Sequence, residues 1–170
     1  MPRSTDQPAP SQAVVDALGA VPSASYVLTS AHDGCRSGSL VRWVQRCSDL
    51  PPMVMVAHRK GHPVEPLIRD SRTFALCRLD DRDLLLRRTF ETERCHGDDP
   101  FISVPARCAP GGSPVLSRAH SYIECELLRH LDIECDYELY VGIVRTAEIL
   151  RGADEPAGRV VAAAALRRPA

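Results

Sequence analysis

Short runs in which apolar and polar residues alternate recur along the chain, and this pattern is typical of β-strands. Strand-like segments cover residues 23–30, 38–47, 52–58, 73–79, 120–130, 137–150 and 158–168. The last segment also has helical propensity, because it contains "VVAAAALRR". Residues 52–58 are apolar almost throughout, which predicts a strand covered on both faces. Asp33-Gly34 predicts a hairpin turn after the first strand.

Three short segments carry helical spacing instead. They cover residues 12–19, 63–71 and 80–90, with Ser11 and Asp80 as the predicted caps of the first and third. Residues 91–117 are rich in proline and contain Gly111-Gly112, so we expect a loop that is functional or holds further short elements. Many short strands joined by turns, with few helices, predict a mainly β fold and a closed antiparallel barrel.

Composition limits the classes of function. The 170 residues, with a formal net charge of -1, suit one domain over residues 12–170 after a disordered tail at 1–11. The balanced charge argues against nucleic acid and membrane surfaces as partners. The sequence contains neither a membrane span nor a signal peptide, so we expect a soluble, cytoplasmic protein.

The cysteines and histidines give no clear metal-ligand pattern. Seven cysteines lack any C-x-x-C pair, and among the six histidines only His58 and His62 are four residues apart, at a basic turn and not on a predicted helix, so the sequence predicts neither a disulfide framework nor a metal site. We expect most thiols to be buried in a reducing compartment. His58 and His62 flank the basic turn Arg59-Lys60 and are expected at the surface.

The segment "GSLVRWVQRCSDLPPMVMV" at residues 38–56 carries the candidate chemistry. Hydroxyl and guanidinium groups bind phosphate, and Ser39, Arg42, Arg46 and Ser48 supply both kinds within a short stretch. Strand alternation would place Arg42 and Arg46 on one face and Trp43 on the other. A planar ring with a phosphate tail would use both faces. Equally, the arginines could form the solvated side of a strand and Trp43 a core residue.

The order of these motifs resembles the flavin reductase-like family of FMN-binding split β-barrels. Residues that fall in step with its pattern are Thr29, Ser30, Gly34, Gly38, Ser48, Pro51, Pro52, Lys60, Ile68, Ser71, Phe74 and Leu79. "LYVGIV" at residues 139–144 is similar to the family's late strand, and "WVQRCS" at 43–48 is similar to one branch of the family. The resemblance covers roughly residues 25–150.

That resemblance implies a six-stranded Greek-key split β-barrel with a few short helices, usually a homodimer, holding FMN in a groove near the subunit interface. It places Ser39, Leu40, Val41, Arg42, Trp43, Gln45, Cys47, Ser48, Lys60 and Cys77 at the flavin, and Tyr137 on the nicotinamide or substrate side. Three residues depart from the family pattern. Arg42 stands where the similar branch has an Asn, and Cys77 stands where the family has an Asn. Tyr137 stands where the family has the His of a Gly-Asp-His motif.

The implied activity is hydride transfer from NADH or NADPH to FMN, with reduced flavin supplied to a partner monooxygenase or another acceptor. Two alternatives stay open. The protein could be an FMN-bound electron carrier or specialised small-molecule redox enzyme without nicotinamide turnover, or a scaffold that has lost flavin and serves as a binding protein or unrelated enzyme.

Overall fold

The computed structural model describes residues 9–92 and 98–150, and the backbone of residues 159–162. The strands are β1 (Tyr26–His32), β2 (Cys35–Val41), β3 (Val44–Asp49), β4 (Pro52–Arg59), β5 (Thr73–Arg78), β6 (Ala106–Cys108), β7 (Pro114–Leu116), β8 (Ser121–Asp132), β9 (Tyr137–Ile149) and β10 (Arg159–Ala162). The helices are α1 (Gln12–Gly19), α2 (Val64–Ser71), α3 (Leu84–Glu91) and the 3-10 turn η1 (Pro100–Ile102).

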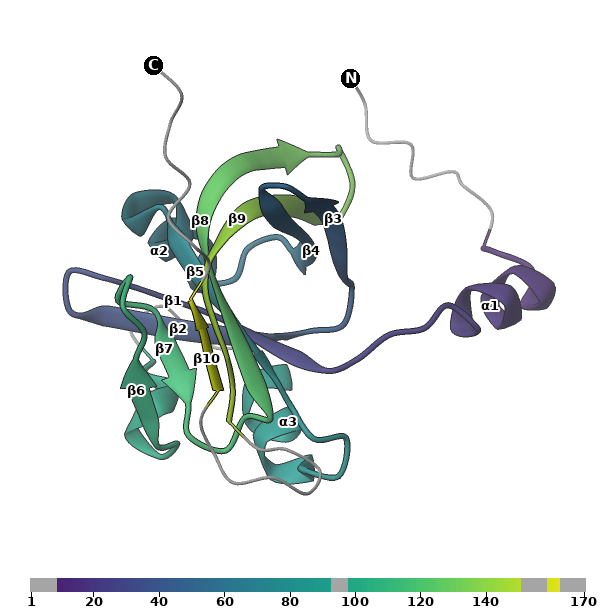
Figure 1. Cartoon of the computed structure of the whole chain (residues 1–170). Helices are drawn as coiled ribbons and strands as arrows, with labels where there is room; N and C mark the ends of the chain where they lie inside the picture. The colour runs from purple at the N-terminus through teal and green to yellow at the C-terminus, as the bar shows by residue number, and fades with distance from the viewer. Residues whose placement is uncertain (1–8, 93–97, 151–158, 163–170) are drawn as a thin grey trace, which may run out of the picture.

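One antiparallel sheet organises the molecule (Figure 1). Its strand order is β2-β1-β5-β8-β9-β4-β3, and β10 pairs with β9. The predicted mainly β, antiparallel fold with few helices is confirmed. The sheet has eight hydrogen-bonded strands rather than the six expected, because β2 and β3 are separate strands and β10 adds to β9. The Greek-key barrel topology stays a prediction.

Two apolar clusters pack on the two faces of the central strands β1 and β5. Val27, Ala75 and Cys77 point to one cluster, which α3 and the β6–β7 hairpin help to form. Leu28 and Leu76 point to the other, which α2 closes with Val64 and Ile68. Successive residues of a strand face opposite sides, so both faces of β1 and β5 are buried. These strands therefore fix the frame on which the neighbouring elements are placed.

Three sequence predictions need correction. In β4, Val54, Val56 and His58 are buried and the residues between them are only half-buried, so this strand is covered mainly on one face. The cap of α3 is Asp83, whose carboxylate accepts a hydrogen bond from the Leu86 N–H, and Asp80 lies outside the helix. The strand expected over residues 38–47 is interrupted between β2 and β3.

Cysteine burial also differs from expectation. Cys77 and Cys125 are buried, whereas the exposed thiols are Cys35, Cys47, Cys108 and Cys135. Edge strand β3 and the β8–β9 turn leave Cys47 and Cys135 open to solvent. Cys95 lies outside the described residues.

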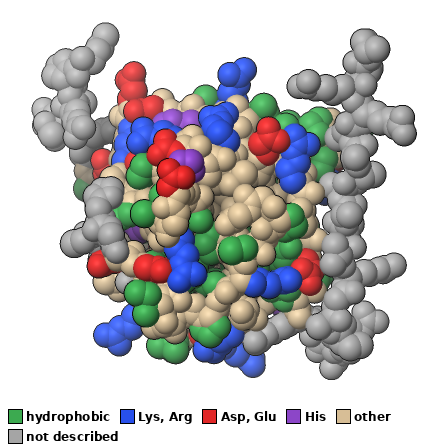
Figure 2. Space-filling model, turned by 90° about the vertical axis from the view of Figure 1, so that its left-hand side faces the viewer, with side chains coloured by type: hydrophobic (Ala, Val, Ile, Leu, Met, Phe, Trp, Pro, Cys, Tyr) green, Lys and Arg blue, Asp and Glu red, His purple; other side chains and the backbone are tan. Residues whose placement is uncertain are grey.

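The first helix was placed correctly from its spacing, but it lies apart from the sheet (Figure 1). None of its residues is buried, and Val14, Val15 and Leu18 are exposed. The predicted tail falls largely outside the described residues, as do residues 163–168 of the last predicted strand. Among the described residues, no helix combines the length and the apolar character that crossing a membrane requires. Basic and acidic side chains are interspersed on the face shown in Figure 2.

Candidate functional site

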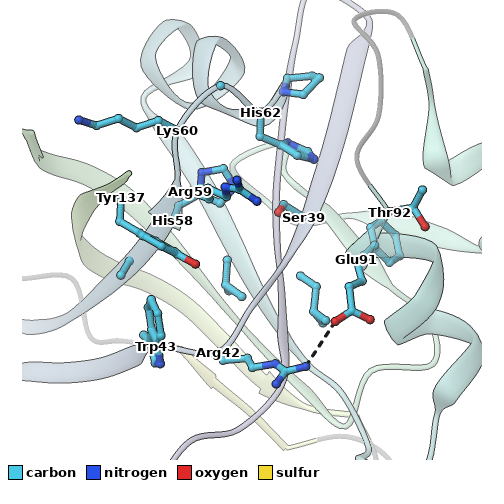
Figure 3. Close-up of a pocket in the computed structure, with 16 residues that line it drawn as sticks. Ser39, Arg42, Trp43, His58, Arg59, Lys60, His62, Glu91, Thr92 and Tyr137 are labelled. Atoms are coloured by element: carbon cyan, nitrogen blue, oxygen red, sulfur yellow. Dashed lines mark hydrogen bonds and ion pairs between the residues drawn. The ribbon is translucent and has the colours of Figure 1, made fainter. Parts of the chain in front are cut away.

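A cavity of about 510 Å³ opens where four segments meet. Residues 39–43 at the end of β2 form one wall, and residues 57–63, from the end of β4 into α2, form another. Residues 90–92 at the end of α3 and Tyr137 at the start of β9 complete the lining (Figure 3). Ligand cavities commonly span about 300–1,000 Å³, so the volume suits a small cofactor.

The break between β2 and β3 turns two neighbouring side chains toward this cavity. Arg42 and Trp43 both line it, although unbroken strand alternation would have sent them to opposite faces. The Trp43 carbonyl accepts a hydrogen bond from the Ala57 N–H at 3.0 Å, which ties the break to β4. The break in the strand therefore places the Trp43 indole and the Arg42 guanidinium on the same side of the chain, at the cavity.

Two aromatic rings form one side of the cavity. The ring centroids of Trp43 and Tyr137 lie 4.9 Å apart with an interplanar angle of 52°. Trp43 is 56% exposed, so a large apolar surface faces solvent at the mouth. Such a surface favours a flat ring as the ligand.

Positive charge lies at the cavity from two directions. The Arg42 guanidinium is 3.4 Å from a Glu91 carboxylate oxygen, an ion pair that spans from β2 to α3 (Figure 3). Arg59 also lines the cavity. The Lys60 ammonium instead lies 2.5 Å from the Asp132 carboxylate and points away from the other lining residues in Figure 3. Arg42 and Arg59 are thus the cations best placed for an anionic ligand.

The inner wall contains a buried imidazole. His58 is 1% exposed, which corrects the expectation that it lies at the surface. Burial, together with a smaller effect of nearby His62, lowers the pKa of His58 to about 3, so the ring is neutral at pH 7. Its ring meets that of His62 edge-on at 5.5 Å between centroids. The charge at the cavity therefore comes from the arginines and not from this histidine.

The structure brings together some of the predicted site residues. Those that line the cavity are Ser39, Leu40, Val41, Arg42, Trp43, Lys60 and Tyr137. Gln45 and Cys47 are exposed on β3, outside the lining. Ser48 follows them on the same strand. Their roles in binding stay predictions.

Cys77 lies away from the cavity. It is fully buried in the cluster beneath α3, with its thiol 3.9 Å from the Pro114 carbonyl oxygen. Burial raises the pKa of the Cys77 thiol to about 12. Its predicted contact with flavin is also untested, and the structure gives this side chain a packing role.

Sequence reasoning missed several lining residues. Glu91 and Thr92 begin the loop expected at residues 91–117 and were not named as site residues, yet they reach the cavity because α3 ends beside β2. The only signal for Glu91 was its position at the end of a predicted helix. His58 could have been found from its place in an apolar strand, where alternation with Val54 and Val56 puts it on the buried face.

Comparison with known families decides the classification. The model of the flavin reductase like domain matches residues 18–164. The chain belongs to the flavin reductase-like family.

Solved structures share the fold of this flavin reductase-like chain. NADH:FAD oxidoreductase SgcE6 of Streptomyces globisporus has a TM-score of 0.74 at 22% identity, over 88% of this chain and 89% of that chain. Nitrilotriacetate monooxygenase component B from Mycobacterium thermoresistibile has a TM-score of 0.72 at 20% identity, over 86% and 82% of the two chains.

A curated relative is much longer. Diflavin flavoprotein A 1 of Synechocystis sp. is 28% identical over 125 residues, which are 73% of this chain and 22% of that protein. This flavin reductase-like chain therefore spans less than a quarter of the relative that it matches.

Proposed function

We propose that this protein is a flavin reductase that binds FMN in the cavity and passes a hydride from NADH or NADPH to it. Reduced flavin then serves a partner monooxygenase or another acceptor. The observation that carries the proposal is the position of the cavity: it is built on residues 39–43, the segment in which the family resemblance places the flavin. A structural neighbour crystallised with NAD and FAD fragments supports the same class of ligands.

The residues present fit a flavin. Trp43 offers aromatic surface for a flat tricyclic ring, and Arg42 and Arg59 offer positive charge for a phosphate. Ser39 lines the same wall with a hydroxyl group. A cavity with an apolar, aromatic side and a few cationic groups is the usual form of a nucleotide-cofactor site.

In this proposal the protein binds and orients, and the flavin supplies the redox chemistry by accepting two electrons and a proton as a hydride. Arg42 exchanges its contact with Glu91 for the flavin phosphate, a change that costs little because exposed ion pairs are weak. Tyr137 takes the nicotinamide side, where its ring stacks against the incoming cofactor and limits water. The chain needs no acid or base of its own for this step.

The electron-carrier alternative has one supporting observation. The curated relative is named a diflavin flavoprotein, and this chain corresponds to under a quarter of it. A domain embedded in such a protein could transfer electrons from its flavin to another centre without releasing reduced flavin. This alternative predicts bound flavin without turnover of a free nicotinamide.

We also propose that the protein is a homodimer. The support is exposed apolar surface at several places: Val14, Leu18, Trp43, Leu50, Leu131 and Ile133. Exposed apolar side chains of this size are candidates for burial against a second subunit. A second subunit could bring Gln45, Cys47 or Ser48 to the flavin of its neighbour.

The test is steady-state oxidation of NADH and of NADPH, followed by nicotinamide absorbance, with and without added FMN. We expect FMN-dependent oxidation of at least one nicotinamide. The absence of any flavin-dependent oxidation would contradict the reductase. Stoichiometric flavin in the purified protein, together with no turnover, would favour the electron carrier.

A matched pair of variants locates the activity. Arg42→Ala should raise the KM for FMN roughly 10- to 100-fold, the usual loss for a hydrogen bond to a charged group. Arg46→Ala removes the same charge from β3, where Arg46 pairs with Asp49 outside the cavity lining. It should leave the KM unchanged. Equal effects of both substitutions on the KM for FMN would contradict FMN binding beside Arg42 in the cavity.

A further inference from the structure

We propose that His58, Glu65 and Glu138 form a binding site for one divalent transition-metal ion of the zinc class. The site adjoins the inner wall of the cavity and is independent of the flavin proposal. Sequence spacing gave no sign of it, because the three residues come from β4, α2 and β9.

The fold places the three side chains together. His58 and Glu138 are directly paired residues of antiparallel β4 and β9, so their side chains leave the same face of the sheet. Glu65 lies in the first turn of α2, which follows β4 after a short turn. One ligand atom from each residue lies within 4.8 Å of the other two.

The cluster is buried, and the His130 imidazole that pairs with Glu138 carries a charge only when it is protonated. Glu138 is 5% exposed, and the side chain of Glu65 is 15% exposed. Two buried carboxylates that face one another require a cation or a proton between them.

His58 gives a second, independent indication. It is 1% exposed, and neither of its ring nitrogens has a hydrogen-bond partner among the described residues. Its Nδ1 points into the cluster, 3.9 Å from a Glu65 carboxylate oxygen, which is too long for a hydrogen bond. Buried polar groups are nearly always hydrogen-bonded. A neutral imidazole nitrogen that has no hydrogen bond and faces two carboxylates is suited to coordinate a metal ion.

Outer groups hold the ligands as they do in metal sites. His130 Nε2 lies 2.5 Å from one Glu138 oxygen, and the buried Tyr140 hydroxyl donates to the other. The His130 ring stacks on Tyr140 with centroids 5.0 Å apart. The Glu65 carboxylate accepts a hydrogen bond from the His62 N–H at 3.0 Å. Such partners orient metal-binding carboxylates and tune their basicity.

The donor set selects the ion. One imidazole nitrogen and two carboxylate oxygens suit zinc, with water as a fourth ligand. Ligand atoms around zinc lie roughly 3.4 Å apart, given metal–ligand distances of about 2.1 Å in a tetrahedron. The ligand atoms must therefore approach one another by up to about 1.4 Å, which rotation of the Glu65 side chain can provide. The ion would tie α2 to the β4–β9 pair.

The test is calorimetric titration of chelator-treated, flavin-free full-length protein with Zn²⁺. Wild-type protein should bind one ion per chain at this site. Glu65→Gln and Glu138→Gln should each weaken that binding by more than 10-fold, since even loss of an outer partner costs about 10- to 100-fold. Glu126→Gln, which removes a carboxylate from an exposed pair with Arg145, is the matched control and should bind like wild type.

The outcomes separate a built site from surface binding. Exposed cysteines could take up zinc elsewhere, so stoichiometry alone is insufficient. Binding that is unchanged in Glu65→Gln or in Glu138→Gln would overturn the proposal, as would a wild-type protein that binds no zinc. Circular dichroism of the variants checks their folding. For a variant that fails to fold, His58→Gln replaces it and must lose binding by the same factor. Because no flavin or nicotinamide is present, the result is distinct from that of the reductase assay.

Discussion

At the scale of single residues, Arg42 and Glu91 control the charge of the cavity. Their ion pair at 3.4 Å joins two exposed side chains, so solvent screens it and it contributes little to stability. The pair matters for binding because the Glu91 carboxylate and a ligand phosphate would compete for the Arg42 guanidinium.

Removing the Glu91 charge should therefore favour an anionic ligand. We expect Glu91→Gln to lower the Kd for FMN by about 1.5- to 5-fold, which corresponds to the ~0.2–1 kcal/mol of an exposed ion pair. Asp49→Asn is the control, since Asp49 pairs with Arg46 on β3 outside the cavity lining. Fluorescence titration measures the Kd of each variant for FMN. A higher Kd in Glu91→Gln than in wild type would contradict competition between Glu91 and the phosphate for Arg42.

At the scale of elements, β9 depends on a close approach that only glycine allows. A Cβ atom at Gly142 would lie 2.6 Å from Phe74 Cζ and 2.6 Å from Cys125 Cβ. Both neighbours belong to the buried cluster closed by α2, and neither has room to retreat. Gly142 therefore sets how closely β9 packs over β5 and β8.

Substitution at this glycine should destabilise the protein. Gly142→Ala is expected to lower the free energy of unfolding by about 1–3 kcal/mol or more, the usual cost of overpacking a core. Gly19→Ala, at the end of exposed α1, meets no atom within 4 Å and should be neutral or stabilising by up to about 1 kcal/mol. Chemical denaturation measures both, and equal stability of the two variants would show that β9 can shift to relieve the clash.

Local patterns predicted the elements better than their contacts. The hairpin at Asp33-Gly34 is present, with positive φ at both residues, and the three helices lie where their spacing placed them. Asp83 rather than Asp80 caps α3, since both aspartates fit the cap pattern and the Asp83 carboxylate is also drawn to Arg118 at 2.9 Å. The ion pair between Asp83 and Arg118, which are far apart in the sequence, distinguishes the two aspartates, and no local pattern predicts it.

The site was predictable in part for the same reason. Residues 39–43 lie in one segment whose order resembles a family motif, so the sequence could group them. Glu91, His58 and Glu138 reach their positions through strand pairing and helix packing, which no local pattern encodes. The break after Val41 also escaped prediction, although it decides that Arg42 and Trp43 share the cavity.

At the scale of the whole molecule, the sheet and its two apolar clusters hold a cavity and a buried polar cluster side by side. His58 belongs to both, because it lines the cavity and contacts the carboxylate group beneath it. The fold thus separates two chemistries: aromatic and cationic groups at the mouth, and carboxylates and imidazole in the interior. We propose that flavin binds at the mouth.

The single tryptophan allows that claim to be tested directly. Trp43 lines the cavity and is the source of the protein's tryptophan fluorescence, and FMN absorbs light in the range where tryptophan emits. We predict that titration with FMN quenches this fluorescence along a saturable curve that ends at one flavin per chain. A linear loss equal to that of free N-acetyltryptophanamide, titrated in parallel, would contradict a flavin site in this cavity.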